Sequence, residues 1–105
     1  MMETEYYILD ENKKAKQVSQ QEYIVWKKKN EKKINLSWQR GDGTKIIALI
    51  FNGTKKTKEK LVLFSVRSIY CSCMDYEILS DFSTDFETYK DALENYNLEV
   101  SLNDY

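Results

Sequence analysis

The stretch that most constrains the fold of this chain is the apolar run I-I-A-L-I-F, from Ile46 to Phe51. It is far shorter than the ~20 residues of a membrane-spanning helix. Its length and its branched side chains suit a strand. Because both alternating faces of the run are apolar, we expect a central strand with cover on both sides. Asn52-Gly53 follows directly and predicts that the strand ends there.

Strand patterns on either side of this run predict further antiparallel strands. Ile34, Leu36 and Trp38 alternate with polar residues, which is the period of a strand with one wet face. Arg40-Gly41-Asp42-Gly43 predicts a tight hairpin turn, because glycine readily adopts a positive φ. The other expected extended segments are Glu5 to Leu9, Lys14 to Val18, Leu61 to Tyr70, and a continuation or a new strand between Cys71 and Ser80.

A capping box predicts the first helix, over about residues 19–30. Ser19 stands at the cap and Glu22 three positions later, so each side chain can bond a free backbone N–H of the first turn. Tyr23 and Trp26, three residues apart, would then share the buried face of this helix.

A second capping box, Thr84 with Glu87, predicts a helix over about residues 84–96. The apolar residues of this segment recur at helical spacing and would form one packed stripe. They are Phe86, Tyr89, Leu93 and Tyr96. The nine residues that follow, from Asn97, are expected to pair as a strand or to stay loose.

The order of these elements predicts an α+β fold: an antiparallel meander of four to five strands with two helices. A chain of 105 residues suits a single domain, residues 1–105. Both helices should pack on one face of the sheet, although the apolar run leaves room for one on each side.

The residue types argue against most catalytic mechanisms. The chain has no histidine, so it lacks the side chain best suited to proton transfer near neutral pH and every Ser-His or Cys-His nucleophile pair. Carboxylate chemistry remains open, but no pair among the 17 Asp and Glu residues stands out. We therefore expect no enzymatic activity and no cofactor.

The two cysteines, Cys71 and Cys73, are expected to be small buried residues on one face of a strand. Two thiols without any histidine cannot complete a tetrahedral zinc site within one chain, so we expect no metal. The N-terminus lacks the basic and apolar regions of a signal peptide. We expect a cytoplasmic protein that does not enter a membrane.

The charge of the chain is divided along its length. Residues 1–60 hold 14 Lys and Arg against 8 Asp and Glu, a net of +6, while residues 61–105 hold 2 against 9, a net of −7. Such a division can guide a partner, or it can be satisfied within the molecule or between copies. The candidate acidic, partner-binding residues are Asp85, Glu87, Tyr89, Asp91 and Glu94. The candidate basic residues for nucleic acid are Lys27, Lys28, Lys29, Lys55, Lys56 and Lys58.

Five short motifs occur in a fixed order along the chain: Y-Y-I-L-D-E-N-K-K, V-S-x-x-E-Y-x-x-W, F-N-G, L-V-L-F and F-S-T-x-x-E-x-Y-x-x-A. This set resembles a group of small phage and bacterial proteins over nearly the whole chain. The resemblance implies a single α+β domain carried by a phage or mobile element, and it supplies no active site. The chain departs from the group at Ser65-Val66, where the others tend to have Glu-Thr, and at Asn95-Tyr96, where they often have Gly-His.

The small size, the divided charge and the resemblance together predict a non-enzymatic inhibitor of the anti-CRISPR type, which binds and disables a host defence nucleoprotein in a bacterial cytoplasm. Its acidic face would enter a basic groove on the effector, or its basic patches would contact the guide RNA. An immunity protein that blocks a toxin and a small RNA- or DNA-binding module are the alternatives. Self-association through the opposite charges is a further expectation.

Overall fold

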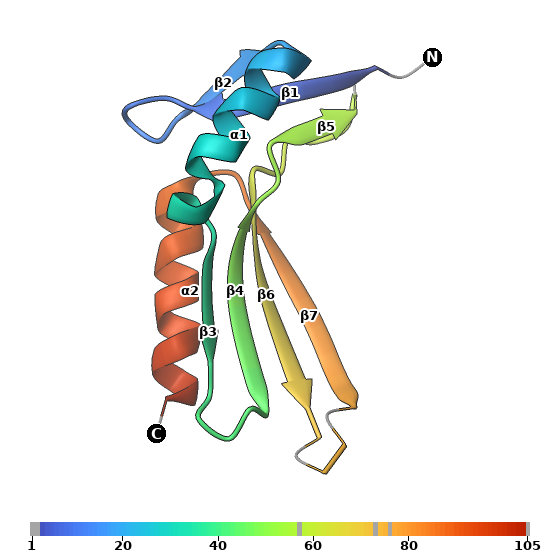
Figure 1. Cartoon of the computed structure of the whole chain (residues 1–105), viewed down its shortest axis with the longest axis vertical. Helices are drawn as coiled ribbons and strands as arrows, with labels where there is room; N and C mark the ends of the chain where they lie inside the picture. The colour runs from blue at the N-terminus through green and yellow to red at the C-terminus, as the bar shows by residue number, and fades with distance from the viewer. Residues whose placement is uncertain (1–2, 57, 73, 76, 105) are drawn as a thin grey trace.

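The computed structural model describes residues 3–56, 58–72, 74–75 and 77–104 and shows an α+β fold with two antiparallel sheets (Figure 1). A three-stranded sheet has the order β2-β1-β5, and a four-stranded sheet has the order β3-β4-β6-β7. The elements are β1 (Thr4–Leu9), β2 (Ala15–Val18), α1 (Gln20–Ile34), β3 (Leu36–Gln39), β4 (Lys45–Phe51), β5 (Thr54–Lys56), β6 (Phe64–Cys71), β7 (Ile78–Phe86) and α2 (Tyr89–Asn103).

The α+β class and the antiparallel meander are confirmed, and the structure adds a second, smaller sheet. That sheet lies with α1 at one end of the molecule, while the larger sheet and α2 form the other end (Figure 1). The chain crosses between the sheets at Asn52 and Gly53, where the sequence predicted a break. Gly53 has a φ of +69°, a conformation that side chains with a Cβ disfavour.

The expectation that the apolar run is covered on both faces is wrong. Ile47 and Leu49 of β4 are fully buried on the face that α2 covers. Ile46, Ala48 and Ile50 alternate with them on the opposite face and remain half-buried. We call these two faces the helix face and the open face of the larger sheet. The run is therefore a central strand with one helix-covered side.

Helix α1 begins where the sequence predicted and ends later. Ser19 is the N-cap, and its Oγ accepts a hydrogen bond from the N–H of Glu22 at 3.2 Å. The helix does not stop near residue 30 but continues to Ile34, which the alternation had placed in a strand. Ile34 is only 4% exposed and continues the buried face of Tyr23 and Trp26 by one more turn. Burial of this side chain extends the helix.

Helix α2 begins and ends later in the chain than the sequence predicted. The expected range of 84–96 begins too early, because Thr84 and Phe86 belong to β7, where they pair with β6. The true cap is Thr88, whose Oγ1 accepts a hydrogen bond from the N–H of Asp91 at 3.2 Å. The helix then runs to Asn103, so the residues that were expected to be loose or extended are helical.

Four aromatic pairs lie in or against the core that the two sheets share. The distances between ring centroids are 5.3 Å for Tyr6–Tyr23, 5.2 Å for Trp26–Phe51, 5.5 Å for Phe51–Phe64 and 5.6 Å for Phe64–Tyr89, and the last three pairs are continuous. These distances fall within the range of favourable aromatic pairs. Each helix therefore contributes rings to a core that both sheets share.

The turn at Arg40–Gly43 is confirmed as the β3–β4 hairpin, with the N–H of Gly43 bonded to the carbonyl of Arg40 at 2.8 Å. Cys71 is buried at the end of β6, as expected, whereas Cys73 and Tyr76 lie outside the described residues. Neither of the helices in the described part of the chain combines the length and the apolar character that crossing a membrane requires.

Candidate interaction surface

The five acidic-face candidates do not all lie on one helix. Asp85 is on β7 and accepts a hydrogen bond from Ser65 Oγ at 3.0 Å. Glu87 precedes α2 and forms an exposed ion pair of 3.3 Å with Lys60. Tyr89 is half-buried against Phe64 and belongs mainly to the core. The structure thus removes three of the five from the expected helical patch.

Asp91 and Glu94 are exposed on α2, and neither forms an ion pair within the described part of the chain. They begin a stripe with Leu98 and Leu102, since the four residues follow one another at steps of three, four and four. Leu98 is 56% exposed and Leu102 is 61% exposed. The stripe lies opposite the buried face of the helix, which contains Ala92 and Tyr96. We call these four residues the outer stripe of α2.

The sequence prediction missed the two leucines of this stripe because it ended the helix too early. Their signal was present in the sequence: Leu98 and Leu102 stand four apart and out of phase with Leu93, Tyr96 and Val100. An apolar pair on the polar side of an amphipathic helix indicates a surface that contacts something else.

The basic candidates divide between two elements at the other end of the molecule. Lys28 and Lys29 are exposed on α1, while Lys27 is half-buried with its Nζ 5.7 Å from the ring centroid of Tyr23. Lys56 and Lys58 are exposed on and after β5.

Lys55 differs from the other lysines, because it pairs with Glu5 across β1 and β5 at 3.0 Å. The hydrogen bond to Glu5 raises the pKa of Lys55 above its ordinary value. The Lys55 side chain therefore contributes to the pairing of β1 with β5.

The division of charge in the sequence is largely retained in space. Of the three ion pairs among the described residues, only Lys60–Glu87 joins the basic end of the molecule to the acidic elements β7 and α2. The pair Lys55–Glu5 lies within the smaller sheet, and Arg67–Asp81 lies within the larger one. Most exposed lysines of α1 and most carboxylates of α2 remain available to a partner.

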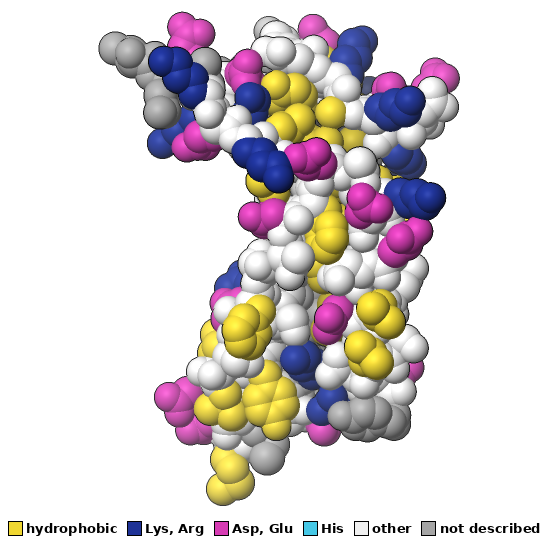
Figure 2. Space-filling view, turned by 180° about the vertical axis from the view of Figure 1, so that it is seen from behind, with side chains coloured by type: hydrophobic (Ala, Val, Ile, Leu, Met, Phe, Trp, Pro, Cys, Tyr) yellow, Lys and Arg dark blue, Asp and Glu magenta, His cyan; other side chains and the backbone are white. Residues whose placement is uncertain are grey.

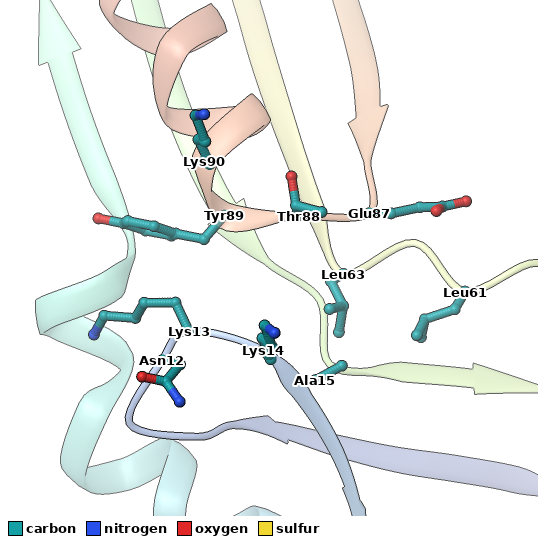
Figure 3. A pocket seen from close by; sticks show the side chains of 10 residues that line it. All are labelled: Asn12, Lys13, Lys14, Ala15, Leu61, Leu63, Glu87, Thr88, Tyr89 and Lys90. Atoms are coloured by element: carbon teal, nitrogen blue, oxygen red, sulfur yellow. The ribbon is translucent and has the colours of Figure 1, made fainter.

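A pocket of about 630 Å³ lies between the β1–β2 turn and the start of α2 (Figure 3). Leu61, Leu63 and Ala15 face one another across it, whereas Thr88 and Lys90 point away. Its lining holds one carboxylate, Glu87, and three lysines, Lys13, Lys14 and Lys90. Its mainly apolar walls suit packing contacts.

A second set of exposed apolar side chains occurs in the β6–β7 turn and along the first half of β7, and Figure 2 shows apolar surface in the lower part of the molecule. Met74 is 89% exposed, Phe82 is 68% exposed, and Ile78 and Leu79 are each 58% exposed. The sequence prediction assigned Phe82 no role. Exposed apolar side chains along one strand are a feature of interaction sites.

No group of three or more His, Cys, Asp or Glu side chains that could hold a metal ion occurs within residues 3–56, 58–72, 74–75 and 77–104. Comparison of the chain with protein-family models, with curated proteins and with solved structures found no match in any of the three.

Proposed function

We propose that this protein is a non-enzymatic inhibitor that binds a protein or nucleoprotein partner through the outer stripe of α2. The observation that carries the proposal is the stripe itself: two carboxylates without an ion pair in the described chain, followed by two exposed leucines on the same side of one helix. An amphipathic helix with anchors at this spacing is a recurring way to fill a groove on a partner.

The chemistry of the stripe favours a partner with a basic groove that has an apolar floor. Helix α2 carries Lys90 as its one cation, against Asp91, Glu94 and Glu99. Carboxylates spaced along a helix can occupy positions that phosphates would take in a nucleic-acid channel. Together with the phage-like resemblance, this supports a host defence nucleoprotein as the target, in the manner of an anti-CRISPR inhibitor.

The test is a purified DNA-cleavage assay with a CRISPR effector from the host, titrated with the inhibitor. Reversing both charges with Asp91→Lys and Glu94→Lys should weaken inhibition about ten-fold or more, because electrostatic attraction speeds association with a basic groove. The matched control reverses Lys28→Glu and Lys29→Glu on α1, which should leave inhibition through α2 intact. Inhibition that survives the first pair of changes would contradict the proposal.

If the changes Lys28→Glu and Lys29→Glu abolish inhibition while the changes on α2 do not, the assay favours contact with the guide RNA through the basic end. Lys28, Lys29, Lys56 and Lys58 are exposed there and form no ion pair within the described residues, an arrangement that also supports the alternative of a small RNA- or DNA-binding module. Titration of the purified protein with labelled RNA at two salt concentrations separates these functions. Strong, salt-sensitive binding by the protein alone would identify the nucleic-acid module.

An immunity protein is the remaining alternative. It would use the same kind of acidic surface against the basic active site of a nuclease toxin. A screen of the purified protein against toxins of its host distinguishes the two: an immunity protein neutralises one toxin and leaves phage defence unaffected.

A further inference from the structure

Strand β7 is a long edge of the larger sheet with an unpaired side. Its nine residues, Ile78–Phe86, pair with β6 along one side. The order β3-β4-β6-β7 places β7 last, and among the described residues no helix or strand lies beyond it in Figure 1. In an antiparallel sheet every second residue of an edge strand directs its N–H and C=O outward. The outer side of β7 therefore offers a row of donors and acceptors to another strand.

The other edges in this molecule have the features that normally prevent such pairing. Strands β2, β3 and β5 have four, four and three residues, and lysine occurs in β2 and β5. Strand β7 is more than twice as long and contains no Lys, Arg or Pro. It also carries apolar side chains that are largely exposed, Ile78, Leu79 and Phe82. Short length and lysine protect edges, and β7 has neither; its own protection is limited to an irregularity at Leu79, at the start of the strand, and to its two aspartates.

We propose that β7 pairs antiparallel with β7 of a second copy of this chain, about a two-fold axis that passes through Phe82. This inference is independent of the proposed function, because it uses a different element and a different partner. A two-fold contact is self-complementary, so one strand must match its own reversed sequence. The sequence of β7 meets this condition in one register better than in its neighbours.

Geometry permits only registers that are centred on a residue. Two residues directly opposite each other must both direct their backbone groups toward the partner strand or both away from it. The ladder of β7 with β6 is regular from Ser80 to Phe86 and shifts register at Leu79. Centring on Phe82 pairs Ser80 through Thr84 within this regular part. It places Phe82 opposite Phe82, Ser80 opposite Thr84, and Asp81 opposite Ser83.

The neighbouring registers bring carboxylates together. Centring on Asp81 places that residue opposite itself, and centring on Ser83 places Asp81 opposite Asp85 twice. Like charges directly opposite each other destabilise a strand pair. The register through Phe82 avoids both conflicts and adds an aromatic pair. The charge pattern thus selects this register.

The carboxylates of β7 are also partly compensated within each copy. Arg67 Nε donates to Asp81 Oδ1 at 2.9 Å, and Ser65 Oγ donates to Asp85. Both carboxylates project on the open face, as their pairing with β6 shows. Phe82 projects on the helix face, where it lines a groove of about 280 Å³ between β7 and α2. The aromatic pair therefore lies on the opposite side of the joined sheet from the carboxylates.

The assembled dimer would have one continuous eight-stranded sheet. Because the axis runs perpendicular to the sheet, both copies of α2 would cover the same face. Their outer stripes would then point to the same side, which would present two copies of the stripe to a large partner.

The experiment is sedimentation velocity over a wide range of protein concentration, at low and at high salt. The full chain should form a dimer that persists or strengthens at high salt, since backbone hydrogen bonds and apolar contacts hold it and salt screens the carboxylates. Phe82→Lys should be monomeric, because it places two like charges opposite each other at the axis. Leu98→Lys, on α2 and similarly exposed, is the matched control and should remain dimeric.

A mixing experiment tests the register itself. Phe82→Lys and Phe82→Glu should each be monomeric, and an equimolar mixture should restore a heterodimer. Circular dichroism establishes that each variant is folded. A full chain that stays monomeric at every concentration would overturn the proposal. So would a dimer that dissolves at high salt, a dimer that Phe82→Lys leaves intact, or a mixture of the two variants that remains monomeric.

Discussion

The hydroxyl of Tyr23 donates a hydrogen bond of 3.1 Å to the carbonyl of Asn52, which fixes α1 to the crossing point between the two sheets. Tyr23→Phe keeps the buried ring and removes the donor. We expect a loss of about 1 kcal/mol in the free energy of unfolding, measured by urea denaturation. Tyr7→Phe is the control, because its hydroxyl lies 3.4 Å from Glu5 in a weaker contact. An equal effect of the two changes would contradict the role of the Tyr23 bond.

Gly53 is expected to tolerate no side chain. Its φ is +69°, and an added Cβ would lie 2.7 Å from atoms of both the Tyr23 and the Phe51 rings. Gly53→Ala should therefore cost about 2 kcal/mol or more, from backbone strain together with crowding in the core. At Gly41 an added Cβ meets nothing within 4 Å, and Gly41→Ala should change the stability by less than about 0.5 kcal/mol. Denaturation of the two variants side by side measures the difference.

The two candidate caps of α2 can be compared directly. Thr88→Ala removes the oxygen that accepts from the N–H of Asp91, and we expect it to cost about 1 kcal/mol. Thr84→Ala changes an exposed residue of β7 and should cost less than about 0.5 kcal/mol. Thermal unfolding followed by circular dichroism ranks the two variants. A larger effect at Thr84 would restore the helix start that the sequence suggested.

The pair of Arg67 and Asp81 predicts a pH effect. The hydrogen bond from Arg67 lowers the pKa of Asp81 below the ordinary value of 3.8. The pKa of Asp81 is lower in the folded chain than in the unfolded chain. The pair therefore stabilises the fold at any pH above the ordinary pKa of an aspartate, and this stabilisation is lost as the pH falls through the lower pKa of the folded state. Arg67→Gln should raise the pKa of Asp81, as NMR titration of the carboxyl carbons would show.

Asp10 is the control for that titration. Its pKa is lowered mainly by the backbone N–H of Lys14, with a further contribution from that of Asn12. These donors belong to the β1–β2 turn and do not depend on Arg67. The pKa of Asp10 should therefore stay low in Arg67→Gln, and a parallel rise of both values would mean that the variant had lost its fold.

Sequence patterns alone located most of the strands and the start of α1. The hairpin at Arg40–Gly43 and the break at Asn52-Gly53 depend on backbone conformations that glycine permits, so they can be read from residue type. The cap at Ser19 is equally local, because donor and acceptor lie three residues apart. Interactions of this range need no knowledge of the rest of the chain.

The start of α2 shows where local patterns were insufficient. Thr84 and Thr88 each have an acidic residue three positions later, so both qualify as caps. Pairing of Thr84 with Val66 and of Phe86 with Phe64 holds the first site in β7, which leaves the helix to begin after the second. Strand pairing between distant segments made this choice. The outer stripe of α2 could not be recognised until the helix end was known.

What the sequence by itself determined about this protein is the mixed α+β class, the positions of its tight turns and the division of its charge, because these follow from residue type and near neighbours. Only the tertiary structure decided that the strands divide into two sheets, that α2 starts at Tyr89, and that β7 is left as an edge. Those outcomes depend on which distant side chains are buried together, and burial is a property of the folded chain as a whole.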